Sequence, residues 1–351
     1  MRQSVRARFI GFTVLTIAAL IYLTPTFISS LPGWWGTALP TSRINLGLDL
    51  QGGTHLVLEV KVDKAIENNV ERIRADLIKI LREKGASGVS VEREGFQLHI
   101  KAPAASAERV RGILKSEYGN LIEAKTPQTV AGNTDLFLTV GKEEMRSLRD
   151  YAVDQSLETI RNRIDQFGVS EPIIQRNGET NILIQLPGIQ DPERAKDIIG
   201  KTALLEFKLV DDNVNVQDAI KNGPPPGRQV LYGQGARGEG IGTEKEAYVL
   251  DARALMTGEY IQDARVRPAE QLQGASVELI LNPAGARLFE QITTANVKRR
   301  LAIVLDNRVY SAPVIQERIG GGRASITGNF DPKEARDLAI VLRAGALPAP
   351  V

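Results

Sequence analysis

A repeated order of secondary-structure elements constrains the fold of this 351-residue chain more than any other feature. After Gly53, a strand-like run leads into a segment whose apolar residues recur at steps of three and four from Ile66 to Ile80. Gly85 follows, where a left-handed helix cap is expected. Two alternating runs, a second helical pattern and a last strand complete the order β-α-β-β-α-β, at 89–92, 96–101, 110–114 and 121–124.

The same order occurs a second time. A strand leads into a helix that ends at Gly168, and the helix-ending glycines, 85 and 168, lie 83 residues apart. The elements that follow are two strands, a helix and a strand, at 173–175, 182–186, 195–199 and 204–210. An antiparallel sheet with helices on one face accommodates this order. The sequence therefore predicts a mixed α+β fold, with two ferredoxin-like units, 54–126 and 135–210, that form a base.

The amino terminus carries an apolar segment without charge. Three arginines precede the stretch 9–42, which contains no Asp, Glu, Lys, Arg or His. Its apolar part, Phe9–Ile28, would span roughly 30 Å as a helix. This pattern predicts a cytoplasmic tip and a transmembrane helix over 1–30, with everything downstream outside. A cleaved signal peptide with its apolar region at 9–23 is the alternative, but no A-x-A-like site follows.

The length and composition point to a further folded domain and away from nucleic acid. The chain is 42% hydrophobic and 25% charged, with a net charge of +2 and no cysteine. A chain of this length exceeds a domain with a single core, so two or three domains are expected. The near-neutral charge provides no basic surface for nucleic acid, and an exported domain without cysteine must fold without disulfides.

A second kind of domain, a compact α+β head, is predicted over 211–328. Its segment 222–246 is rich in Pro and Gly and is expected to be a loop. A helix from Asp331, within 329–351, is expected to return the chain toward the membrane. The remaining predicted elements are strands at 263–267, 277–281, 301–305, 309–315 and 324–327 and a helix around 286–292.

No constellation for catalysis, cofactor or metal binding is predicted. Gly233–Gly238 matches the dinucleotide pattern, but no helix or βαβ unit is expected after it. Gly200–Thr202 resembles the end of a phosphate loop, but a helix precedes it and a strand follows, which is the wrong order. The only histidines, His55 and His99, each stand alone in a strand pattern. No serine lies in a nucleophile elbow.

Three motifs occur in a fixed order along the chain: Leu46–Gly53 (LGLDLQGG), Arg161–Pro172 (RNRIDQFGVSEP) and Leu342–Pro348 (LRAGALP). Together they resemble the SecD family of protein-export membrane proteins, and the resemblance runs from the first residues to the last. Motif positions are therefore the candidate site residues: Leu46, Gly47, Asp49, Gln51, Gly52, Gly53, Arg161, Arg163, Asp165, Gly168, Glu171 and Pro172.

Each motif also has a structural interpretation. Gly52 and Gly53 let the chain turn from a linker over 31–53 into the first strand. Asp49 is expected to cap or turn the backbone rather than to act as an acid. Pro172 is expected to end a helix and begin a strand.

The three charged residues of the second motif are Arg161, Arg163 and Asp165. They lie within about one helix turn and flank an apolar stripe. We expect them to form a solvated or inter-domain salt-bridge face.

The resemblance implies an accessory, non-enzymatic subunit in the cell inner membrane. Its expected partners are the SecYEG channel, SecF, YajC, an unfolded preprotein and the lipid bilayer, with no cofactor and no nucleic acid. The whole machine is expected to use the proton gradient, but the single predicted span has no ionisable side chain for a proton relay. We therefore expect the proton path to lie in spans outside this sequence, which reads as a fragment or as the first piece of a longer protein.

The head is expected to move relative to the base. The chain enters it after Leu204–Leu209 and leaves it near Thr327–Asn329, and two nearby crossings permit rigid-body rotation. The predicted hinge residues are Leu209, Val210, Gly328 and Asn329. Two alternatives remain open: a fragment of a resistance-nodulation-division type exporter, whose porter domains are also duplicated ferredoxin-like units, and a passive envelope scaffold.

Overall fold

The structure is a computed structural model, and it describes residues 2–28, 32–39, 41, 52–130, 132–169, 171–189, 191–233, 246–267 and 275–351. Leu46, Gly47, Asp49 and Gln51 of the first motif lie outside the described residues. Two compact units make up the chain. The smaller comprises 1–55, 169–173 and 185–192, and the larger comprises 56–168, 174–184 and 193–351.

The smaller unit contains the predicted apolar helix. Helix α1 (Arg2–Phe27) includes Val5–Thr26, whose mean hydropathy of 1.8 and length suffice to cross a membrane. Three threonine hydroxyls inside it donate to the carbonyl oxygens four residues earlier, so these polar groups are satisfied within the helix. A short helix, α2 (Trp35–Ala38), follows. The predicted helix is confirmed, and whether it is retained in the mature protein stays a prediction.

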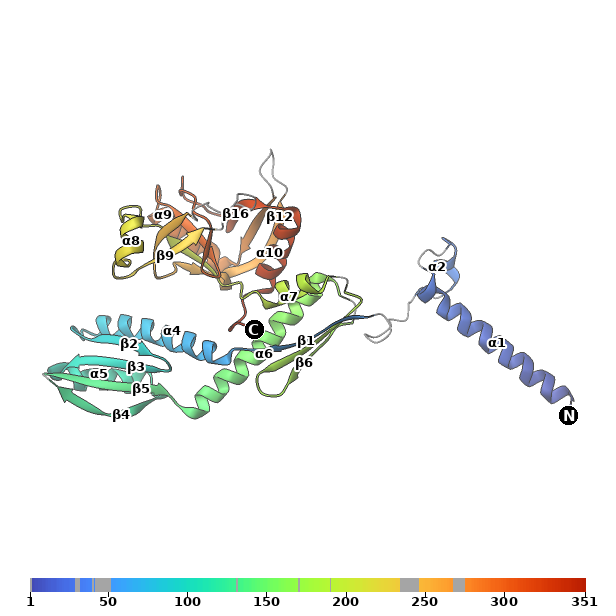
Figure 1. Ribbon diagram of the computed structural model, residues 1–351, viewed down its shortest axis with the longest axis horizontal. Coiled ribbons are helices and arrows are strands. Elements are labelled where there is room, and N and C mark those ends of the chain that lie inside the picture. Colours follow the sequence, from blue (N-terminus) through green and yellow to red (C-terminus); the bar gives the residue numbers. More distant parts are fainter. Residues whose placement is uncertain are drawn as a thin grey trace. The chain divides into compact units, whose positions relative to one another are not determined.

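A four-stranded antiparallel sheet forms one part of the base, with the order β2-β3-β5-β4. Alternate residues of β3 and β5, such as Leu98, Ile100, Leu136 and Leu138, are buried against the apolar faces of α4 and α5. Figure 1 shows these elements together. Their bounds are α4 (Val62–Glu83), β2 (Ser90–Glu94), β3 (Gln97–Pro103), α5 (Ala104–Glu117), β4 (Leu121–Val130) and β5 (Asn133–Val140).

A three-stranded sheet, β1-β7-β6, forms the other part of the base. Backbone hydrogen bonds from Gly188 N to Gly52 O (3.0 Å) and from Val60 N to Thr180 O (2.9 Å) show that β1 and β7 run antiparallel. Gly52 and Gly53 have φ values of 70° and 147°, which fits the predicted turn into the first strand. The elements are β1 (Gly53–Glu59), α6 (Lys142–Phe167), β6 (Ile173–Asn177), β7 (Asn181–Pro187) and α7 (Pro192–Gly200).

The predicted order of elements is therefore confirmed, but the two repeats exchange their first strands. A ferredoxin-like sheet has the strand order 4-1-3-2, and in the four-stranded sheet β5 occupies the position that the prediction gave to β1. Strand β1 instead pairs with β7 of the second repeat. The cause is the tight connection between β4 and β5, which pair from Val130↔Asn133 onward and so form a hairpin.

The last strand of the second repeat also leaves its expected sheet. Strand β8 (Leu205–Leu209) lies in a six-stranded sheet with the order β10-β9-β15-β14-β8-β11. A three-stranded sheet, β12-β13-β16, completes the strands of this region. We call residues 53–200 the base and residues 205–344 the head.

The main apolar cluster of the head lies between its sheets and helices and includes Phe207, Phe289 and Leu338, and a second cluster includes Leu250 and Val304. Its elements are α8 (Val216–Asn222), β9 (Arg228–Gly233), β10 (Ala247–Asp251), β11 (Met256–Thr257), η1 (Gly258–Tyr260), β12 (Ile261–Arg267), β13 (Ala275–Leu281), α9 (Pro283–Ala295), β14 (Leu301–Leu305), β15 (Arg308–Ser311), β16 (Arg323–Phe330) and α10 (Pro332–Ala344).

Two predictions for the head need correction. The Pro- and Gly-rich segment 222–246 is not all loop, because β9 lies inside it and pairs with β10. The strand predicted at 309–315 ends at Ser311, after which Val314 makes only an isolated bridge with Arg300. The final helix begins as predicted, since the Asp331 side chain and Glu334 form a capping box.

A glycine pair tests how far the cap of α6 determines stability. Gly168 ends α6 with φ 81° and ψ 31°, and an added Cβ would meet no atom within 4 Å. Gly168→Ala should therefore lower the free energy of unfolding by about 1–2 kcal/mol through backbone strain alone. Gly112, in α5, also has open space around it but no positive φ. Gly112→Ala should raise that free energy by about 0.5–1 kcal/mol. Urea denaturation of both variants measures the two values, and equal signs would contradict the assignment.

Candidate functional site

The second motif places a fully buried arginine in the base. Arg163, on α6, has 0% of its surface exposed. Its Nη1 donates to the carbonyl oxygens of Ile198 (3.0 Å), Ile199 (2.8 Å) and Lys201. Its Nη2 donates to the carbonyl oxygen of Gly345, at 2.9 Å. The second motif and the third motif therefore meet at this side chain.

Helix ends explain why a cation is stable there. The last carbonyl groups of α7 have no partner within their own helix, and the end of a helix dipole favours positive charge. Burial lowers the pKa of the Arg163 guanidinium to about 10, which the negative charge of Asp306 opposes. The group therefore stays protonated at neutral pH.

The expectation for Arg163 was wrong, whereas Arg161 behaves as expected. The Arg161 side chain is 43% exposed and lies 2.6 Å from Glu158. Asp165 is exposed as well. Arginine is almost never fully buried without partners, which made a solvated face the natural expectation. The signal that was missed is spacing: 163 lies three and seven residues after the buried Ile160 and Ser156, within the apolar stripe of α6.

The remaining residues of the second motif have backbone roles. Gly168 caps α6 in the left-handed conformation, as predicted. Glu171 has a φ of 49°, and Pro172 directly precedes β6. These residues turn the chain from the helix into the strand.

The segment 201–204 carries the chain from the base into the head, and we call it the first crossing. Its carbonyl at Lys201 binds Arg163 of the base, as described above. Its amides at Ala203 and Leu204 instead donate to the Asp306 carboxylate of the head, at 3.2 and 3.0 Å. Ala203 has a φ of 57°, which is uncommon for a residue with a side chain. The first crossing is thus held by a cation on one side and by an anion on the other.

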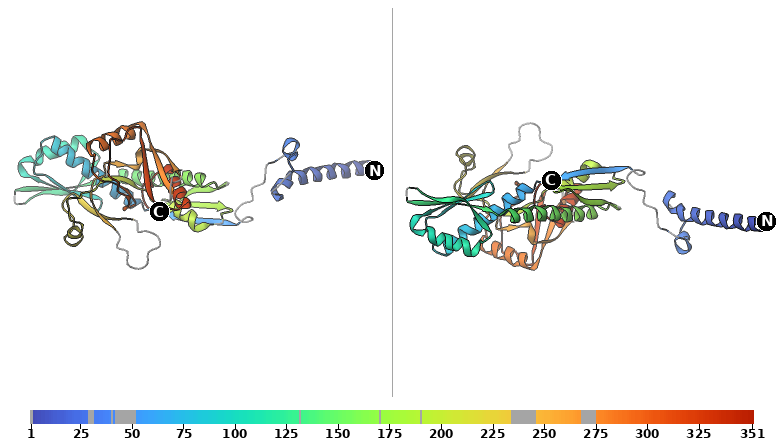
Figure 2. Two further views of the ribbon diagram at one scale, coloured as in Figure 1. Left: turned by 90° about the horizontal axis from the view of Figure 1, so that it is seen from above. Right: turned by 90° about the horizontal axis from the view of Figure 1, so that it is seen from below.

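Residues 345–351, which we call the second crossing, return from α10 to the base. Leu347 N donates to Thr202 O of the first crossing at 2.8 Å. Lys61 N donates to Pro350 O at 2.8 Å, so the C-terminus lies beside the end of β1 (Figure 2). Leu347 and Ala349 are buried. We call the place where both crossings meet Arg163 the joint.

Ion pairs connect the helices around the joint. Arg194 of α7 lies 2.7 Å from Asp337 of α10, and its guanidinium stacks at 5.0 Å on the Phe167 ring. Helix α10 also packs against α6. Base and head are therefore in direct contact beyond the two crossings.

The arginine of the third motif makes a second set of contacts. Arg343 lies 2.8 Å from Asp263 of β12, and it also donates to Gln166 of α6 at 2.8 Å. Burial by itself would raise the pKa of Asp263. The hydrogen bond from Arg265 and the charge of Arg343 outweigh burial, so this pKa is lowered.

The predicted hinge residues lie in strands or directly beside one. Leu209 belongs to β8, and Val210 N donates to Arg300 O at 3.0 Å. Gly328 and Asn329 belong to β16, where the pairing with β13 is irregular. Rotation at Leu209 or Val210 would break backbone hydrogen bonds to β14 or Arg300, whereas Gly328 and Asn329 lie at the register shift of β16. The two crossings lie outside the sheets.

The glycine patterns and the histidine that were set aside in the sequence have structural surroundings. Gly233 ends β9, and the rest of its glycine pattern lies outside the described residues. Gly200 ends α7 ahead of β8, in the order expected. His99 stacks on Phe137 and lies 2.9 Å from Asp135. Within the described ranges, no three His, Asp or Glu side chains are placed to hold a metal ion.

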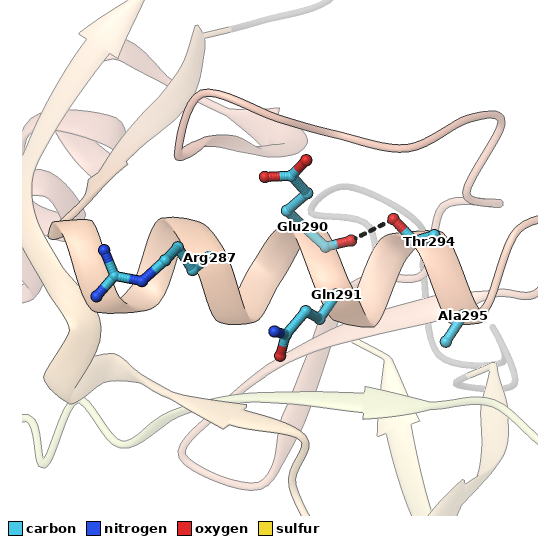
Figure 3. A pocket seen from close by; sticks show the side chains of 5 residues that line it. All are labelled: Arg287, Glu290, Gln291, Thr294 and Ala295. Atoms are coloured by element: carbon cyan, nitrogen blue, oxygen red, sulfur yellow. Dashed lines mark hydrogen bonds between the residues drawn. The ribbon is translucent and has the colours of Figure 1, made fainter.

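The head carries a shallow pocket on α9 (Figure 3). It has a volume of about 440 Å³ and is lined by one face of the helix: Arg287, Glu290, Gln291, Thr294 and Ala295. The opposite face of α9 is buried through Phe289 and Ile292. Ile319 N donates to Thr293 Oγ1 at 3.1 Å, so the loop before β16 lies along this helix. Exposed Val297, Val314 and Ile319 follow the helix or lie on this loop.

Comparisons with known proteins agree with the motifs. The model of the SecDF P1 head subdomain matches residues 229–349, the N-terminal model of the P1 domain of protein translocase subunit SecDF matches 153–212, and the SecD/SecF GG motif matches 37–64. Protein translocase subunit SecD of Syntrophobacter fumaroxidans is 48% identical, over 96% of this chain and 64% of that protein. The subunit of Calditerrivibrio nitroreducens is 41% identical, over 99% of this chain and 65% of that protein.

A crystal structure of SecDF in a super-membrane-facing form matches all of this chain and 34% of its own, with 26% identity and a TM-score of 0.50. The apolar helix, the α+β fold and the three motifs agree with these relatives, which are named subunits of a protein translocase. The chain belongs to the SecD family. It spans about two thirds of the length of the curated relatives that it matches.

A substitution pair tests the role of the buried arginine. Arg163→Met should lower the free energy of unfolding by about 2–4 kcal/mol, because buried carbonyl groups lose their donor while the cost of burying a charge is relieved. Arg161→Met, two residues away and exposed, should change it by less than about 0.5 kcal/mol. Chemical denaturation gives both values. Similar losses in the two variants would mean that the contacts of Arg163 contribute little.

Proposed function

We propose that this chain is the preprotein-handling part of an accessory subunit of the Sec protein-export machinery. The observation that carries the proposal is the joint: two crossings, both held by Arg163, connect a separate head to the base. Membership in the SecD family supports the same function. In the complete protein, SecF, the SecYEG channel and YajC are the partners, and the cell inner membrane is the location.

Helix α1 serves as the membrane anchor in this proposal. Its amino-terminal side carries Arg2, Arg6 and Arg8, which favours a cytoplasmic amino terminus and an extracytoplasmic base and head. No ionisable side chain with a role in proton transfer lies between Phe9 and Ile28. Coupling to the proton gradient therefore comes from spans beyond this sequence.

Movement of the head relative to the base is the mechanical step of this proposal. The head turns at the first and second crossings rather than at Leu209, Val210, Gly328 and Asn329. Opening requires the loss of polar contacts, among them Arg194–Asp337 and Arg343–Gln166, and of the apolar contacts that Ile198 and Phe167 make with the head. The Arg343–Gln166 contact is exposed and contributes little to stability, whereas the side chains of Arg194 and Asp337 are only 29% and 14% exposed.

A rigid scaffold is the second candidate function. Most of the base and the whole head belong to the larger compact unit, and α10 packs directly on α6. A head that never leaves this position would make the joint a structural support.

A tie across the joint distinguishes movement from a rigid scaffold. The chain has no cysteine, so Gln166→Cys and Arg343→Cys can be joined by a short bifunctional thiol reagent. If the head moves, the tied subunit in the complete translocase should export a secretory protein several-fold more slowly than the untied one. Equal export rates would favour the rigid scaffold.

The control for this tie lies inside the base. Lys84 and Glu117 are 2.6 Å apart, at the ends of α4 and α5. Cysteines at these two positions, joined by the same reagent, should leave the export rate unchanged. A loss in this control would show that the reagent harms export by itself.

The pocket on α9 is the proposed contact surface for the unfolded preprotein. Its open helix face and the exposed valine and isoleucine side chains beside it offer apolar contacts without sequence preference. A photoreactive residue at Gln291 should crosslink to a stalled secretory chain, whereas one at exposed Lys79 of α4 should not. Equal crosslinking at the two positions would remove α9 as the contact surface.

A further inference from the structure

The two terminal nitrogens of Arg163 bind different parts of the molecule. All three acceptors of Nη1 lie at or just after the end of α7, at Ile198, Ile199 and Lys201. The one acceptor of Nη2, Gly345 O, lies just after α10. A single guanidinium thus links the base to the second crossing.

These two sets of bonds differ in how firmly they are held. Helix α7 is a regular helix with three buried side chains, Ala195, Ile198 and Ile199, and Ile198 lies in the apolar cluster of the head. The carbonyls at its end are therefore held by a packed helix. The second crossing has no helix or strand of its own after Ala344. Its backbone bonds in this region are those of Gly345, Leu347 and Pro350.

We propose that Arg163 is a positioning residue with one fixed and one releasable half. Nη1 stays with α7 as its cap, and the bond from Nη2 to Gly345 O is the latch that holds the second crossing against the base. Release of this bond frees residues 345–347 while α7 stays folded. In this proposal, the bond to Gly345 breaks before the bonds to α7. Its relevance to export rests on the proposed function, but its test does not use export.

The backbone of Gly345 supports this assignment. Its φ of 91° and ψ of 172° belong to a region that is essentially restricted to glycine. Here a side chain would meet no atom within 4 Å, so conformation alone demands glycine. This conformation places the Gly345 carbonyl where Nη2 can reach it.

Hydrogen exchange at two amides distinguishes the bonds of Nη1 from the bond of Nη2. Leu347 N–H bonds to Thr202 O and reports on the second crossing, whereas Lys201 N–H bonds to Asp197 O and reports on the last turn of α7. In Arg163→Lys, one ammonium group can still serve the carbonyls of α7 but cannot also bind Gly345. Exchange at Leu347 should become about tenfold faster, as expected for the loss of one charge-assisted hydrogen bond, and exchange at Lys201 should stay unchanged.

Two further variants make the test decisive. Gly345→Ala should speed exchange at Leu347 in the same way without any change to Arg163, so it serves even if Arg163→Lys fails to fold. Arg161→Lys, on the same helix and exposed, should leave both amides as in the wild type. Gly320→Ala, where φ is not positive and space is open, controls for the added methyl group.

The outcomes are distinct. Unchanged exchange at Leu347 in both Arg163→Lys and Gly345→Ala would overturn the latch. Equally faster exchange at Leu347 and Lys201 in Arg163→Lys would also overturn it, because α7 and the second crossing would then open together. Neither result depends on export, so a failure here leaves the tie between α6 and α10 to decide the proposed function separately.

Discussion

The buried guanidinium of Arg163 is the interaction on which the joint depends. A charge with no exposed surface is costly, and it is tolerated here because four backbone carbonyls from two segments accept its hydrogen bonds. The same carbonyls would otherwise be unsatisfied at a helix end. The hydrogen bonds therefore compensate for burial of the charge only while α7 and the second crossing both lie beside α6. This mutual requirement makes one side chain sensitive to the position of the head.

The exchange of first strands between the repeats gives the base its cohesion. Strand β5 completes the four-stranded sheet and continues directly into α6, while β1 pairs with β7 on the other side. Neither repeat can complete its sheet alone, so the two cannot separate without breaking strand pairs. The second repeat then lacks its fourth strand, because β8 lies in the head. The second repeat is therefore split between the base, which holds its first elements, and the head, which holds β8. Residues 201–204 connect the two parts.

Local sequence patterns predicted most helices and strands of this fold, but they could not predict which strands pair with each other. Alternation and three-four spacing located most helices and strands, and Gly168 and Asp331 marked helix ends through chemistry that acts over a few residues. The apolar alternation of β5 fits either sheet equally well, so its partner depends on the connection to β4. Arg163 was misjudged because a charged side chain is normally exposed, and its acceptors lie 35 to 182 residues away. The first motif's Leu46, Gly47, Asp49 and Gln51 lie outside the described residues.

The hinge at Leu209, Val210, Gly328 and Asn329 stays a prediction, and the structure adds how these residues lie relative to the sheets. The number of chain crossings was correct, but their ends were taken from sequence positions near Val210 and Gly328, which the structure places in or beside paired strands. Sheet hydrogen bonds make such positions stiff, because rotation there would break several bonds at once. The two crossings lie outside the sheets, but each residue of the first crossing takes part in a hydrogen bond. A cation and an anion hold the first of them from opposite sides. If the head rotates at the first crossing, the rotation strains the bond from Arg163 of the base or the bonds to Asp306 of the head.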